Sequence, residues 1–87
     1  MMKSLAKSGL QTIPGVGPKI EYLLNDVGVF SIEEMKTANP QRLYEDLCNQ
    51  KAAPVDRCVL YVFRCAKYYA TNKDPDPERL KWWKWKD

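Results

Sequence analysis

The chain has 87 residues, which is enough for one domain and leaves no room for a second hydrophobic core. Hydrophobic residues make up 45% of it and charged residues 29%, a balance typical of a folded rather than a disordered protein. No apolar stretch approaches the roughly 20 residues that a membrane-spanning helix needs. Residues 1–7 also lack the apolar block of a secretion signal. We therefore expect a soluble, cytoplasmic protein that contacts no membrane.

The net charge of +3 is unevenly distributed along the chain. Residues 1–40 carry as many acidic as basic side chains, so the whole excess lies in residues 41–87. This mild basic bias permits a polyanionic partner such as DNA but does not require one. Charge alone therefore decides little about function.

Three cysteines and the absence of histidine restrict the chemistry that this protein can perform. Cys58 and Cys65 would lie about 10.5 Å apart along a helix, beyond the roughly 7 Å between Cα atoms that a disulfide allows. Without histidine or a C-x-x-C pair, no plausible set of zinc ligands exists, and no side chain is ready to transfer protons near neutral pH. We expect no metal, no cofactor, no catalytic residue and no enzymatic activity. The cysteines should act as small buried hydrophobic residues.

Glycine and proline residues divide the chain into helical segments, and no alternating strand pattern interrupts them. The start marked most clearly is that of the third segment, where Ser31 can cap the helix and Glu34 completes a capping box. Proline suits the first position of the second and fourth segments, because its missing N–H costs nothing there. The four helices expected before the long one cover about residues 5–13, 19–27, 31–38 and 40–48.

The longest expected helix covers residues 55–71 and has the pattern of a central element. At 100° per residue, its apolar side chains share one broad face. The members of this face are Val55, Cys58, Val59, Val62, Ala66, Tyr69 and Ala70, with Leu60 and Phe63 extending it. We expect this face to be buried, and Cys58 and Cys65, which flank it, to be protected from solvent.

Two further groups of side chains are candidates for contact with nucleic acid. The first is a stripe on the long helix, formed by Arg57, Tyr61, Arg64 and Tyr68. The second is the segment at residues 81–86, Lys-Trp-Trp-Lys-Trp-Lys, which follows a turn at residues 72–77. Both could grip phosphates and stack bases, but both could equally cover neighbouring helices, and we favour the structural interpretation. The residues that could make such secondary nucleic-acid contacts are Arg57, Arg64, Lys81, Trp82 and Lys84. At least one tryptophan should pack on the bundle while another stays partly exposed.

The most informative segment is the loop at residues 13–19, which reads Ile-Pro-Gly-Val-Gly-Pro-Lys. Gly15 and Gly17 permit a tight turn, since glycine tolerates backbone angles that other residues avoid. Val16 can then point inward, while the two glycine amides face outward at the start of the next helix. Such N–H groups and the helix dipole favour an anion, and Lys19 adds a positive charge in the first turn. The pattern therefore predicts a phosphate site at Gly15, Val16, Gly17 and Lys19.

This segment resembles the helix-hairpin-helix motif of DNA repair and recombination proteins, in which an apolar-Gly-apolar-Gly hairpin grips a backbone phosphate. The resemblance covers residues 5–29 and implies an all-α, SAM-like bundle of about five helices with sequence-independent DNA binding. Residues 31–71 fit a degenerate second half, because Lys-Ala-Ala-Pro at residues 51–54 lacks the glycines of a second hairpin. Residues 72–87 then form a tryptophan-rich tail. A single hairpin should bind DNA weakly.

The remainder of the chain resembles the small microbial pathogenicity locus proteins, through residues 43–48, 55–66 and 80–85. That family implies a helix-hairpin-helix fold and no defined activity. An alternative function therefore stays open, in which the motif is only a scaffold. The protein would then be a protein–protein interaction or structural adaptor, self-associating through Trp82, Trp83 and Trp85.

Overall fold

The computed structural model describes residues 9–52 and 55–86, and this part of the chain is helical, with no strand. Among the described helices, none combines the length and hydrophobicity that crossing a bilayer requires. Within the described ranges, four consecutive α-helices are preceded by one short 3-10 helix and followed by two. The order is η1 (Leu10–Thr12), α1 (Pro18–Asp26), α2 (Ile32–Thr37), α3 (Pro40–Lys51), α4 (Arg57–Thr71), η2 (Pro77–Leu80) and η3 (Trp82–Trp85). The expectation of an all-α fold is confirmed.

Local capping explains where three of the four α-helices begin. The side chains of Ser31, Asn39 and Asp56 accept hydrogen bonds from backbone N–H groups in the first turns of α2, α3 and α4. Each such bond satisfies donors that a helix start leaves without an intrahelical partner. α1 differs, because it begins after Gly17, which has no side chain to offer.

The first expected helix, over residues 5–13, lies only partly in the described region. Its described part is the single turn η1, preceded by Gly9 in the left-handed conformation, with φ 82°. Both the backbone N–H and the hydroxyl of Thr12 donate to the Gly9 carbonyl oxygen, at 3.1 and 2.6 Å. Residues 1–8 lie outside the described part, so a fifth α-helix and the SAM-like arrangement remain predictions.

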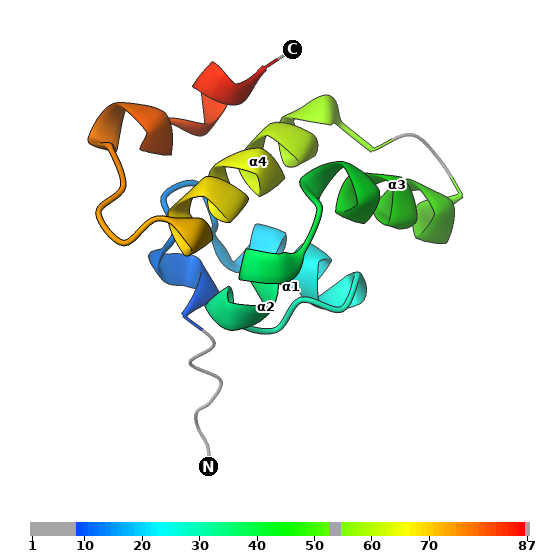
Figure 1. The fold of residues 1–87 in the computed structure, drawn as a ribbon. Helices are drawn as coiled ribbons and strands as arrows, with labels where there is room; N and C mark the ends of the chain where they lie inside the picture. Colours follow the sequence, from blue (N-terminus) through cyan, green and yellow to red (C-terminus); the bar gives the residue numbers. More distant parts are fainter. Residues whose placement is uncertain (1–8, 53–54, 87) are drawn as a thin grey trace.

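α4 is the central element, as its apolar pattern predicts. Figure 1 shows it lying between the C-terminal segments η2 and η3 and the group formed by α1, α2 and α3. It packs against α2 and α3 on one side and against η2 and η3 on the other. Leu60 and Phe63 are completely buried between these layers. Because α4 is covered on two sides, its buried surface is wider than one amphipathic stripe.

The two cysteines of α4 differ in exposure, and the prediction that both are buried is wrong for one of them. Cys65 is buried and its thiol donates to the Arg79 carbonyl oxygen, at 3.7 Å. Cys58 is exposed. Seven residues apart, the two side chains lie on nearly the same side of the helix. The difference therefore comes from position along the axis: Cys58 lies in the first turn, whereas η2 covers Cys65.

The C-terminal segment is held on α4 by specific hydrogen bonds. A guanidinium nitrogen of Arg64 in α4 donates to the Trp85 carbonyl oxygen at 2.7 Å. Within the C-terminal segment, the Trp85 indole N–H donates to the Arg79 carbonyl oxygen at 2.7 Å. The backbone N–H of Asp76 donates to the Tyr68 hydroxyl at 2.8 Å. Arg64 and Tyr68 belong to the stripe singled out in the sequence. That part of the stripe therefore docks the tail, which supports its structural interpretation.

The tryptophans divide their roles as expected. In a 3-10 helix, residues three apart lie on the same side, so Trp82 and Trp85 share one face of η3 and Trp83 points elsewhere. Trp82 packs against the hydrophobic core, and the Trp85 ring lies 5.6 Å from the Tyr68 ring between centroids. Trp83 is 50% exposed. The tail is thus part of the folded domain, with one ring left accessible.

Truncation after Pro77 should lower the melting temperature by more than about 10 °C. The truncated chain loses two partly buried rings, Trp82 and Trp85. Removing one fully buried aromatic side chain costs about 3–5 kcal/mol, and each kcal/mol corresponds to about 4–8 °C in a domain of this size. Thermal unfolding followed by circular dichroism measures the shift. Trp83→Ala is the matched control, because its exposed ring contributes less, and its melting temperature should fall only slightly. Equal melting temperatures of truncated and full-length protein would contradict the packing role of the tail.

The cysteines should react with a thiol reagent at clearly different rates. Exposed Cys58 should label in the native protein, and Cys65 only when the tail is removed or the protein unfolds. A hydrogen bond with the Asp56 carboxylate raises the pKa of the Cys58 thiol. Because the thiolate is the reactive form, its labelling rate should keep rising as the pH increases beyond the range where an ordinary cysteine levels off. Mass spectrometry of digested samples assigns the label, and equal rates for both cysteines would show that the tail leaves Cys65 open.

Candidate nucleic-acid interface

The loop between η1 and α1 has the tight geometry that its glycines predict, but only one of them is strained. Gly15 has φ 91°, in the left-handed region that favours glycine. The backbone N–H of Val16 donates to the Ile13 carbonyl oxygen at 3.0 Å and closes the turn. The Val16 side chain is 4% exposed, so it points into the core as predicted.

Gly17 does not need to be glycine for the sake of the turn. Its backbone angles, φ −100° and ψ −170°, are extended values that any residue adopts. A Cβ atom added there would meet no heavy atom within 4 Å. The expectation that both glycines serve the turn is therefore wrong for Gly17. What its missing side chain provides is open space in front of the first turn of α1.

The start of α1 presents backbone donors toward that space. The first hydrogen bond of the helix runs from the Glu21 N–H to the Gly17 carbonyl oxygen, at 2.9 Å. Within the described part of the chain, the N–H groups of Gly17, Lys19 and Ile20 have no protein acceptor. The Lys19 side chain is exposed beside them. Free donors, the positive end of a helix dipole and a nearby ammonium group are the features of an anion site.

The C-terminal segment packs directly on this loop. A Cβ atom added to Gly15 would lie 2.8 Å from Cδ1 of the Trp82 indole, closer than a Cβ atom can approach. Position 15 therefore requires glycine for two reasons, its positive φ and the close approach of the Trp82 ring. The sequence contains no local sign of this contact, because the two residues come from opposite ends of the chain.

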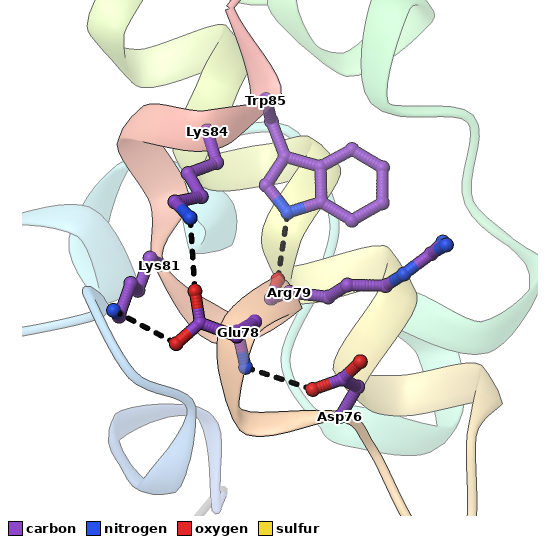
Figure 2. Close-up of polar contacts among 6 residues, drawn as sticks. All are labelled: Asp76, Glu78, Arg79, Lys81, Lys84 and Trp85. Carbon is purple, nitrogen blue, oxygen red and sulfur yellow. Dashed lines mark hydrogen bonds and ion pairs between the residues drawn. The ribbon is translucent and has the colours of Figure 1, made fainter.

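Two lysines of the tail share one carboxylate, as Figure 2 shows. The Glu78 carboxylate lies 3.0 Å from the Lys81 ammonium and 2.9 Å from that of Lys84. These hydrogen bonds, that of Lys84 first, lower the pKa of Glu78 to about 2. The carboxylate is therefore ionised throughout the neutral range, and the cluster of three groups keeps one net positive charge.

The predicted secondary contacts are not gathered around the loop as one surface. The Arg57 guanidinium lies 5.7 Å from the centre of the Tyr44 ring, on the side facing α3. Arg64 holds the tail, as described above. Trp82 does adjoin the loop, but its ring is used for packing. Trp83, which is not among the predicted nucleic-acid contacts, is the accessible ring next to it. The two indoles meet edge-on, with centroids 5.8 Å apart and an interplanar angle of 88°.

A concave feature on the tail has mixed charge. This hollow of about 310 Å³ is lined by Asp76, Glu78, Arg79, Lys84 and Trp85, five residues that Figure 2 draws. Its two carboxylates offset its two cations, so it does not favour an anion over a cation. Across residues 9–52 and 55–86, no group of three or more histidine, cysteine, aspartate or glutamate side chains is arranged to hold a metal ion.

Comparison with known proteins agrees with one of the two resemblances noted in the sequence. A family model described as Cdd1, pathogenicity locus, matches residues 3–87. No curated protein and no solved structure matched the chain. The matched region includes the glycine loop, α1–α4 and the whole of the tryptophan-rich tail. The chain belongs to the Cdd1 pathogenicity locus family.

Proposed function

We propose that this protein binds DNA without sequence preference, by accepting a backbone phosphate at the start of α1. The loop of residues 13–17 and α1 then form the hairpin and second helix of a helix-hairpin-helix motif. The observation that carries the proposal is the uncapped N-terminus of α1 behind Gly17, a glycine that the turn does not require. A phosphate oxygen takes the place that a capping side chain occupies in α2, α3 and α4.

The expected binding is weak and dependent on salt. A phosphate contact carries no information about the base sequence, so binding through it is the same for unrelated duplexes. Each phosphate neutralised by a lysine contributes about one unit to the slope of log affinity against log salt concentration. In this proposal Lys19 makes that contact, and one such contact gives low affinity.

A protein-interaction role is the second candidate, and one observation favours it. Three large aromatic side chains are unusually exposed: Tyr22 at 63%, Phe30 at 56% and Trp83 at 50%. Tyr22 and Phe30 have no part in the phosphate site. If the glycine loop served only as a packing surface for Trp82, substitutions at Lys19 and Gly17 would not change the affinity for DNA.

Replacing Lys19 by alanine should weaken DNA binding equally on unrelated sequences and lower the salt slope by about one unit, because one phosphate contact is lost. Fluorescence anisotropy of labelled duplexes at several salt concentrations measures both quantities. Arg42→Ala is the matched control, since it removes one exposed positive charge from α3, outside the proposed site. The same affinity for a folded Lys19→Ala protein and the wild type would rule out the hairpin as the binding site.

Gly17→Ser should change stability and DNA binding in opposite directions. Serine is a good N-cap residue and fits the extended backbone of position 17, so the melting temperature should stay the same or rise slightly. Its hydroxyl would accept from the N–H groups of α1 and occupy the open space, so affinity for DNA should fall. Gly15→Ala gives the contrast, because positive φ and the Trp82 ring oppose it, and it should lower the melting temperature. A capped, stable Gly17→Ser protein with undiminished affinity would contradict the proposal.

A further inference from the structure

Trp83 is an accessible aromatic face held in a fixed position beside the hairpin loop. Its indole is half exposed, whereas that of Trp82 packs on the core and that of Trp85 is hydrogen-bonded to the Arg79 carbonyl oxygen. The edge-on contact with Trp82 places the Trp83 ring 5.8 Å, between centroids, from a ring that touches Gly15. An exposed ring on a folded segment has already lost much of its freedom, so binding to it costs little further ordering.

Basic residues neighbour Trp83 along the chain. Lys81 and Lys84 flank it in the chain and leave one net positive charge after pairing with Glu78, and exposed Lys86 follows. Lys19 lies in the first turn of α1, which begins three residues after Gly15, the loop glycine that Trp82 covers. An aromatic face among cations is the combination that proteins use to bind single-stranded nucleic acid, by stacking the bases and attracting the phosphates.

We propose that Trp83 stacks on an unpaired base of a DNA strand whose phosphate lies at the start of α1, so that single-stranded DNA is the preferred ligand. This proposal rests on the proposed function, because the hairpin holds the phosphate that brings the base to the ring. Paired bases of an intact duplex are already stacked on their neighbours and cannot use Trp83 without unstacking. The ring therefore adds affinity for a single strand and none for a duplex.

The test compares Trp83→Ala with wild type on an oligothymidine of about 10 nucleotides, which covers one such site, and on a blunt-ended duplex of equal length. Loss of one stacked base should weaken binding of the oligothymidine roughly 5- to 150-fold and leave the duplex affinity unchanged. The salt slope should stay the same, since no charge is removed. Trp83→Phe, which keeps an aromatic face, should retain most of the affinity and guards against a folding defect. Phe30→Ala removes a similarly exposed ring that follows the C-terminal end of α1. It should leave the affinity for both DNA ligands unchanged.

The outcomes separate this inference from the proposed function. If Lys19→Ala weakens binding but Trp83→Ala does not, the hairpin binds phosphate and the stacking proposal is wrong. Equal losses on duplex and single strand for Trp83→Ala would also overturn it, because they indicate a general role of the tail. If only the tryptophan variant weakens binding, the hairpin proposal fails together with the link between the two sites. No binding of either DNA by the wild type would refute both.

Discussion

The contact between Trp82 and Gly15 connects the two ends of the described chain and determines how the rest of the candidate site is arranged. It requires a glycine with positive φ, because a side chain at that position would collide with the indole. It also requires the tail to lie on α4, where Arg64 and Tyr68 hold it through hydrogen bonds. The loop, the central helix and the tail therefore pack together, and each of them depends on the others for its position.

The need for a tail follows from the size of the domain. A chain of 87 residues buries a smaller fraction of its surface than a larger protein does, so each additional apolar contact counts. α4 presents apolar side chains over more than half of its circumference, and α2 and α3 cover only part of that surface. Short 3-10 helices carrying tryptophans supply the missing cover at a cost of few residues. The short length of η3 also leaves Trp83 facing outward, because a 3-10 helix of four residues cannot direct three rings toward one surface.

The two loop glycines have separate physical roles, and this separation connects structure with function. Gly15 serves the fold, through its backbone angle and the approach of Trp82. Gly17 lies in ordinary extended backbone with open space before it, so its lack of a side chain has no consequence for packing. The missing side chain of Gly17 instead leaves the backbone N–H groups at the start of α1 open to a ligand. The phosphate proposal thus depends on a residue whose replacement should leave the fold intact, so that binding and stability can be measured independently.

The sequence by itself determined the features that depend on near neighbours. These include the capped starts of α2 and α3, the proline-led start of α1, the inward direction of Val16 and the central position of α4, all of which follow from spacing and capping preferences along a few turns. It did not determine which glycine is strained, since both fit the same local pattern. It placed Cys58 and Cys65 on one buried face, yet only the tertiary structure shows that η2 covers Cys65 and leaves Cys58 open. It identified Trp82 as a nucleic-acid contact, whereas the packing of that ring on Gly15 leaves Trp83 as the accessible one. These features depend on contacts between segments far apart in the chain. The sequence pattern within a single segment cannot predict such contacts.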